Sequence, residues 1–156
     1  MTGTPTKTLL LVGNLPDLSA ALDGLPCAFT VAGSVQSAVQ QVESARPDLI
    51  LCDYPDLDEL RAAHPDAPIV VLAHDRANES VFVAMEKAFA YLTPPFEPGV
   101  IREVVVEALE NSDPPGSIQV LSRQPNFIML RLRCTFTTAN RLVRFAMQLK
   151  TDLPEE

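Results

Sequence analysis

Short apolar runs alternate with amphipathic stretches along the first 110 residues. The run Leu49-Ile50-Leu51-Cys52, bounded by Pro47 and Pro55, predicts a strand buried on both faces, as in a parallel sheet. Similar runs predict strands over residues 8–12, 28–31, 68–72 and 89–92. Apolar residues at helical spacing predict helices over 16–22, 35–45, 57–63, 78–88 and 100–110.

This alternation of five strands with five helices predicts an α/β fold. We expect a doubly wound five-stranded parallel sheet of flavodoxin-like order 2-1-3-4-5, because each crossover must return right-handed over the sheet. That order places the carboxyl ends of the strands at Val12, Cys52 and Leu72 side by side. Asp53 directly follows the central strand and is therefore the first candidate for a functional carboxylate.

A small unit of different character follows the predicted sheet. The polar, proline-rich segment 111–116 predicts a linker between a domain over 1–110 and a module over 117–156. Runs over 118–121 and 127–134 predict a β-hairpin, and a helix is expected from Thr135 or Thr137 to Lys150. The predicted apolar side of this helix carries Ala139, Leu142, Val143, Ala146 and Leu149. So small a β-hairpin plus helix extension should pack on the first domain, on a second chain or on further sequence.

Composition restricts the function classes. A net charge of −8 argues against nucleic-acid binding, although the basic residues after Gly116 predict a solvated basic face on the extension. No apolar run is long enough for a membrane span, and the polar N-terminus lacks the core of a secretory signal. We therefore expect a cytoplasmic protein with no membrane contact.

The side chains most often used as metal ligands form no matched set. Cys27, Cys52 and Cys134 have no C-x-x-C spacing and are expected to be buried free thiols. His64 and His74 are expected to be exposed loop residues. The sequence therefore predicts no metal site.

Two segments carry a family resemblance. Asp48-Leu-Ile-Leu-Cys-Asp53, with the lead-in Arg46-Pro47, resembles the strand that ends in the phosphorylated aspartate of bacterial response-regulator receiver domains. Tyr91-Leu-Thr-Pro-Pro-Phe96 resembles that family's segment with a switch aromatic and a Lys-Pro-Phe turn. The resemblance covers residues 7–110 and implies that Asp53 is the phosphoacceptor of a two-component phosphorelay and Tyr91 the switch residue.

The positions matching the rest of the family's site differ in chemistry. The family's two metal-binding acids match Gly13 and Asn14, its hydroxyl residue matches Ala73, and its lysine matches Pro94. Asp17 is the nearest acid along the chain and is expected on the following helix. Phosphoryl transfer to a carboxylate needs Mg²⁺ and a cation, so these replacements remove most of the electrostatic support for it. Mg²⁺ is accordingly expected as a cofactor only if Asp53 does accept phosphate, and no cofactor is expected otherwise.

The leading hypothesis is a non-enzymatic, degenerate pseudo-receiver that signals through protein contacts. Asp53 would then cap nearby backbone amides, and Tyr91 would be fixed inward, filling space beside Ala73. We expect regulation of a fused or partner ATPase or kinase module, and a homodimer through Val81 to Leu109 with Phe82, Phe89 and Val106 exposed.

Two alternatives remain open. One is a conventional phosphoacceptor receiver with Asp53 phosphorylated. The other is a fragment of an ATP-dependent anti-sigma-factor-type serine kinase, because residues 128–156, including Leu130-Arg-Leu-Arg-Cys134 and Thr138 to Leu142, resemble the start of that family's ATPase domain. The family's Asn-bearing ATP-site helix and Gly-rich segments are not in these residues.

Overall fold

The computed structural model describes residues 7–13, 15–42, 46–74, 77–111, 113–124 and 127–149. Its main sheet contains five parallel strands in the order β2-β1-β3-β4-β5, which confirms the predicted fold. The strands are β1 (Lys7–Val12), β2 (Cys27–Ala32), β3 (Leu49–Cys52), β4 (Ile69–Leu72) and β5 (Ala90–Leu92).

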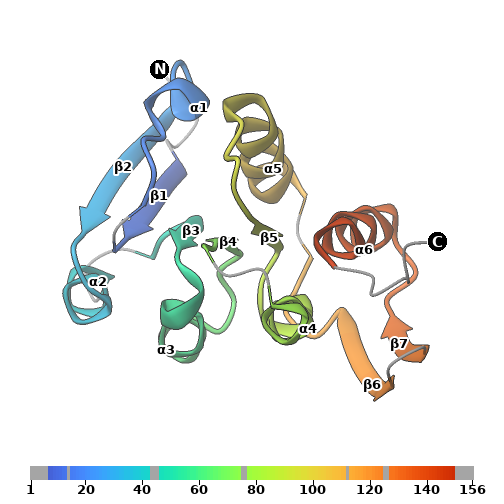
Figure 1. Ribbon diagram of the computed structural model, residues 1–156. Helices are drawn as coiled ribbons and strands as arrows, with labels where there is room; N and C mark the ends of the chain where they lie inside the picture. Colours follow the sequence, from blue (N-terminus) through green and yellow to red (C-terminus); the bar gives the residue numbers. More distant parts are fainter. Residues whose placement is uncertain are drawn as a thin grey trace.

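Helices cover both faces of this sheet, as Figure 1 shows. On one face lie α1 (Ser19–Leu22) and α5 (Pro98–Glu110). On the other lie α2 (Val35–Val42), α3 (Leu57–Ala63) and α4 (Asn78–Lys87), with a short 3-10 turn, η1 (Tyr54–Asp56), leading into α3. Of the predicted helix over 35–45, residues 43–45 lie outside the described part of the chain. No helix in the described ranges is both long and apolar enough to cross a membrane.

Alternate residues of each central strand enter opposite cores. Ile50 and Cys52 pack with α2, α3 and α4, whereas Leu49 and Leu51 pack with α1 and α5. All four residues of β3 are fully buried. The continuous apolar run at 49–52 therefore reflects burial on two faces.

α1 begins three residues later than predicted, at Ser19, and has only four residues. Asp17 therefore precedes the helix and accepts hydrogen bonds from the backbone N–H and hydroxyl of Ser19, which lower the pKa of its carboxyl group. The outer strand β2 is poorly covered on this side: Val31 is 68% exposed.

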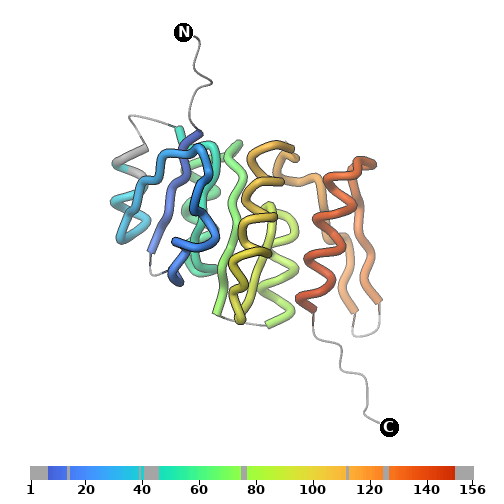
Figure 2. The backbone as a smooth tube through the Cα atoms, turned by 90° about the horizontal axis from the view of Figure 1, so that it is seen from above, coloured from blue at the N-terminus to red at the C-terminus, as the bar shows by residue number. Residues whose placement is uncertain are grey.

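The C-terminal extension packs against the β5 edge of the sheet. It consists of β6 (Ile118–Gln124) and β7 (Phe127–Leu132), paired antiparallel, and α6 (Phe136–Gln148). In Figures 1 and 2, α6 lies beside β5 and the hairpin lies beyond α4. Glu86 of α4 accepts a hydrogen bond from the Val120 backbone N–H at 2.7 Å, and the Arg123 guanidinium lies over the Phe82 ring. The extension thus packs on α4 and β5.

The buried face of α6 matches only in part the one that its apolar residues predict. Thr138, Arg141 and Phe145 are buried, whereas Ala139, Val143 and Ala146 are exposed. The predicted capping residue Thr135 does accept a hydrogen bond from the Thr138 backbone N–H at 3.1 Å. Leu142 and Leu149 are half-buried and pack against the core, as predicted. The prediction is wrong for Ala139, Val143 and Ala146, because Arg141 finds buried acceptors, described below, that a sequence pattern does not reveal.

The face predicted to mediate a homodimer is largely occupied by this extension. Phe89 is only 3% exposed, so its predicted exposure is wrong, and Phe82 and Val106 are half-buried. Arg141 of α6 lies over the Phe89 ring. Residues 81–109 therefore present much less open apolar surface than the sequence suggested.

The cysteines are free, as predicted, but only Cys52 is buried. Burial and the charges of Asp56 and Asp53 raise the pKa of its thiol well above the usual range. Cys27 is half-buried and Cys134 is exposed, so the prediction of three buried thiols is wrong for these two. The sheet core needs a small apolar side chain at position 52, and Cys52 supplies it.

His64 is buried, contrary to the prediction, whereas His74 is exposed. His64 follows α3, and within the described ranges its Nε2 atom has no hydrogen-bond partner. Burial and the neighbouring charge of Arg61 lower the pKa of His64 below its ordinary value of 6.5. The folded protein therefore keeps this imidazole neutral to lower pH than the unfolded chain does.

A pH dependence of stability follows. As the pH falls through 6.5, the unfolded chain takes up a proton at position 64 before the folded protein does, so the free energy of unfolding decreases. The slope from one group cannot exceed about 1.4 kcal/mol per pH unit. Urea unfolding between pH 7.5 and 5.5 should show a flatter profile for His64→Gln than for the natural chain. An unchanged slope in His64→Gln would refute this assignment.

Candidate functional site

Asp53 lies at the carboxyl end of the central strand, where parallel α/β sheets collect functional groups. Its side chain is half-buried, and its Oδ1 atom accepts a hydrogen bond from the Tyr54 backbone N–H at 2.7 Å. Asp53 thereby caps η1. In the described part of the chain, no ion pair joins Asp53 to an arginine or lysine.

A second carboxylate, which the sequence reasoning missed, lies beside this site. The 3-10 turn after Asp53 brings Asp56 back toward Gly13, and a Cβ atom added at Gly13 would lie 3.2 Å from Asp56 Oδ2. Gly13 also has φ +81°, a conformation that L-residues with side chains rarely adopt. Asp17 does not approach this position within 4 Å, so Asp56 rather than Asp17 is the acid against Gly13.

The pKa of Asp56 reflects its surroundings. Burial, followed by the negative charges of Asp53 and Glu59, raises the pKa of the Asp56 carboxyl group. A signal was present in the sequence, since a Pro in Asp53-Tyr54-Pro55-Asp56 favours a tight turn. Asn14, the other position matched to the family's acids, lies outside the described residues.

The two positions matched to the family's hydroxyl and lysine supply neither group. Ala73 is fully buried, and its backbone N–H donates to the Leu92 carbonyl at 2.8 Å. Pro94 is half-buried and precedes Pro95 through a cis peptide bond. The neighbouring Thr93 hydroxyl donates to Gln148 Oε1 at 2.6 Å and is thus directed toward α6.

Tyr91 points into the core. It is 1% exposed and packs in the same apolar cluster as Ala73 and Phe145. Its ring meets the Tyr54 ring edge-on, with centroids 6.3 Å apart. Tyr54 therefore contacts both the Asp53 carboxylate, through its backbone, and Tyr91, through its ring. A switching role for Tyr91 stays a prediction.

The site carries few metal ligands. Across the described ranges, no three His, Cys, Asp or Glu side chains are grouped so that they could hold a metal ion. Among the described residues, Asp53 and Asp56 supply two carboxylates at this position, whereas Mg²⁺ requires octahedral oxygen coordination, which water can complete. The residues present are a poor fit to a resident magnesium ion.

Comparison with known proteins identifies the architecture. No family model and no curated protein matches the sequence. Among solved structures, a response regulator from Thermotoga maritima is 19% identical, with a TM-score of 0.60 over 68% of this chain and 99% of that one. The chain has the receiver-domain fold.

Two structures of NtrX from Brucella abortus support the same conclusion. Its isolated receiver domain is 23% identical, with a TM-score of 0.58 over 67% of this chain and 99% of that one. The match to the longer NtrX chain, solved in complex with ADP, has the same identity and TM-score but spans only 26% of that chain. The similarity concerns the fold, and about a third of this chain lies outside it.

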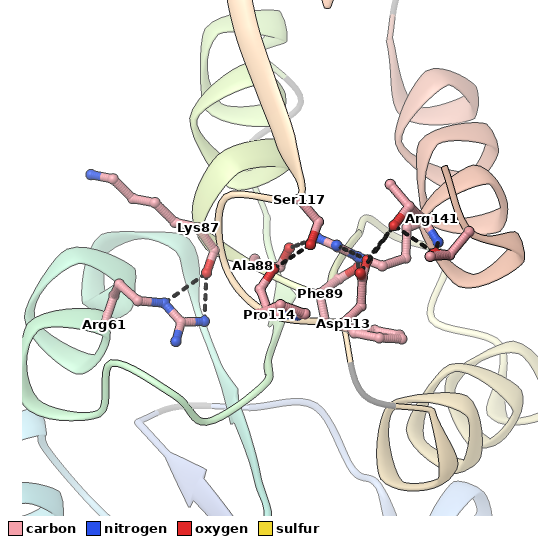
Figure 3. Close-up of polar contacts among 10 residues, drawn as sticks. Arg61, Lys87, Ala88, Phe89, Asp113, Pro114, Ser117 and Arg141 are labelled. Atoms are coloured by element: carbon pink, nitrogen blue, oxygen red, sulfur yellow. Dashed lines mark hydrogen bonds and ion pairs between the residues drawn. The ribbon is translucent and has the colours of Figure 1, made fainter. Parts of the chain in front are cut away.

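Within this receiver fold, two arginines hold the junction between α4 and β5: Arg141 is buried and Arg61 is half-buried. Arg61 of α3 donates to the Lys87 carbonyl through Nε at 2.8 Å and through a terminal nitrogen at 2.6 Å. Arg141 of α6 donates to the Phe89 carbonyl at 2.9 Å and also to the Ala88 carbonyl. Figure 3 shows the two guanidinium groups on opposite sides of these consecutive carbonyls.

Asp113 completes the arrangement from the segment before β6. Its carboxylate forms an ion pair with Arg141 and accepts a hydrogen bond from the Thr138 hydroxyl at 3.0 Å. The side chains of Arg141 and Asp113 are 3% and 1% exposed. Burial, and the charge of Arg141, lower the pKa of Arg61 to about 10, so Arg61 remains charged at neutral pH. The extension is thereby anchored to the receiver by a buried charged network.

Proposed function

We propose that this protein is a non-catalytic pseudo-receiver, a signalling domain that acts through protein contacts. The observation that carries the proposal is the set of residues around Asp53 that stand where the family has its functional groups: Ala73 offers no hydroxyl, Pro94 offers no cation, and Gly13 offers no carboxylate. Phosphoryl transfer to an aspartate accumulates negative charge that metal ions, lysine and hydrogen-bond donors must stabilise. Asp53 has its backbone partner at Tyr54 instead.

The anchored extension supports the same proposal. Arg141 and Arg61 hold the junction between α4 and β5, and Tyr91 is packed beneath Phe145 and Ala73 in one cluster. A conformational switch needs two states that differ little in free energy, and a buried network of this kind favours one of them. We infer that the receiver serves as a fixed platform whose readout is the extension.

The test is phosphorylation. The chain is incubated with acetyl phosphate and Mg²⁺, and its intact mass is measured. We expect no gain of a phosphoryl group, and an Asp53→Asn variant should behave identically. A gain in the natural chain that disappears in Asp53→Asn would refute the proposal.

One observation favours a second candidate, a working phosphoacceptor. Asp56 lies against Gly13, the position from which the family's metal-binding acid would extend, so it could lend a carboxylate from another part of the chain. If this candidate is right, Mg²⁺-dependent phosphorylation occurs at Asp53 and is lost in Asp56→Asn as well. Arg123→Gln, which alters an exposed pair with Glu79, is the matched control and should retain it.

The C-terminal extension suggests which kind of module the pseudo-receiver regulates. We infer a fused or partner ATPase or kinase module in the cytoplasm, because the extension resembles the start of such a domain and leaves apolar side chains uncovered. Sequence encoded beyond Glu156 tests the fused form, including a serine kinase: an Asn-bearing ATP-site helix within a few dozen residues supports it. Unrelated sequence there would refute the fused form.

A further inference from the structure

The outer face of α6 carries an uncovered apolar stripe. Phe136, Val143 and Met147 are 92%, 59% and 77% exposed. Asn140, also exposed, lies between them on the same face. The other face of this helix is fixed inward by Phe145, Arg141 and Thr138, so the stripe cannot be buried by rotating α6 on its own domain.

The spacing of this stripe is that of a coiled-coil seam. Positions 136, 140, 143 and 147 are separated by four, three and four residues, the alternation that keeps side chains facing one partner helix. The flanking residues Ala139 and Ala146 are small and exposed, which allows a partner helix to approach closely. None of these six residues is charged, although the whole chain has a net charge of −8.

A charged side chain that adjoins the stripe in sequence is already paired within the chain. Arg144, beside the seam, hydrogen-bonds to Glu107 at 2.8 Å and Glu103 at 3.3 Å, both on α5. Two copies meeting along α6 would therefore not bring unpaired charges of the same sign together at this position.

We propose that a second copy of this chain docks on this stripe, with the two α6 helices parallel and in register. Asn140, the single polar residue of the stripe, favours a second copy of the chain as the partner and a parallel orientation of the two helices. Against a wholly apolar partner Asn140 would lose its hydrogen bonds, whereas in a parallel in-register pair it faces Asn140 of the other copy. An antiparallel pair would set Asn140 against Val143 instead.

The contact is small, and this sets the expected strength. A helix of 13 residues presents about two heptads. The area that so short a seam buries is smaller than the roughly 800 Å² per partner of a stable interface. The dimer should therefore be weak and concentration-dependent. The inference rests on the proposed function, because protein contacts are its proposed output.

Sedimentation of the full chain tests the association. We expect the dimer fraction to increase with protein concentration. Phe136→Glu and Met147→Glu should each raise the concentration at the midpoint of the monomer–dimer transition at least tenfold. Val31→Glu, at an apolar position on β2 that is 68% exposed, is the matched control and should leave this midpoint unchanged. A chain that stays monomeric at millimolar concentration, or an equal effect of Val31→Glu, would overturn the proposal.

Cross-linking tests the direction. In a Cys27→Ser, Cys134→Ser background, Phe136→Cys alone should form a disulfide-linked dimer under mild oxidation, and so should Met147→Cys alone. In an antiparallel pair these thiols would be separated by about 16 Å along the axis, and only a mixture of the two variants would cross-link. That mixed product as the sole dimer would overturn the parallel arrangement. Failure of either experiment leaves the phosphodonor result untouched, so it is distinguishable from failure of the proposed function.

Discussion

Replacing Arg141 with methionine is expected to reduce the free energy of unfolding by about 3–5 kcal/mol, because it leaves the buried Asp113 carboxylate without its partner. The change also removes the donors to the Ala88 and Phe89 carbonyls. Methionine retains an unbranched side chain, so packing against Phe89 and Phe145 is partly preserved. Urea unfolding followed by circular dichroism measures the effect.

Two variants separate the charge effect from packing. Arg123→Met removes an exposed pair with Glu79 and should reduce the free energy of unfolding far less than Arg141→Met does. The double variant Arg141→Met, Asp113→Leu removes both charges and should recover a large part of the lost stability, since a buried ion pair contributes little beyond an apolar replacement. Equal losses in Arg141→Met and Arg123→Met would contradict a buried anchoring role.

Phe145→Ala is expected to reduce the free energy of unfolding by about 3–5 kcal/mol, comparable to Arg141→Met. Phe145 is fully buried in the cluster that contains Tyr91 and Met85, so its removal leaves a cavity between α6 and the receiver sheet. The same helix supplies the control. Phe136 is 92% exposed, and Phe136→Ala should change stability by less than about 0.5 kcal/mol.

Both phenylalanine variants should be compared by urea unfolding at a concentration where the chain is monomeric, because Phe136 is also in the proposed dimer seam. If Phe145→Ala and Phe136→Ala had the same effect, α6 would not be packed on β5 as described. A large loss confined to Phe145→Ala is the result expected if Phe145 packs between α6 and the receiver sheet.

The sheet was predictable because its strands are short and buried on both faces. The run Leu49–Cys52 has no polar position, which indicates burial on both faces, and the alternation with helices indicates a doubly wound parallel sheet, for which 2-1-3-4-5 is one of the common strand orders. The inward face of α6 was not predictable by the same logic. Apolar periodicity assigns Val143 to the core, but the core accepts Arg141 because carbonyls and Asp113, far away in sequence, satisfy it.

The candidate site shows the same limit. Asp53 could be located from its strand, and the replacements at Ala73 and Pro94 could be read from the sequence. The approach of Asp56 to Gly13 depends on a turn geometry and a missing Cβ atom, which become visible together only in three dimensions. His64 was misassigned for a similar reason, since its burial arises from the end of α3 and not from any local pattern.

Several contacts hold the α4–β5 junction and the end of β5 in one arrangement. The α4–β5 junction is held from α3 by Arg61 and from α6 by Arg141, and Thr93 at the end of β5 is tied to Gln148. In this arrangement the carboxyl edge of the sheet is connected to the extension by direct contacts. We propose that the output surface lies on the extension, on the outer face of α6, instead of on the face that α6 covers.

If the protein is a pseudo-receiver, the carboxyl edge around Asp53 binds neither a divalent cation nor a phosphoryl group. The most direct measurement is the amide spectrum of the ¹⁵N-labelled chain before and after addition of Mg²⁺ and beryllofluoride, a phosphoryl mimic. We predict unchanged amide shifts for Asp53, Tyr54, Asp56, Ala73 and Tyr91 to Thr93. Saturable shifts at these residues that are absent in Asp53→Asn would contradict the account.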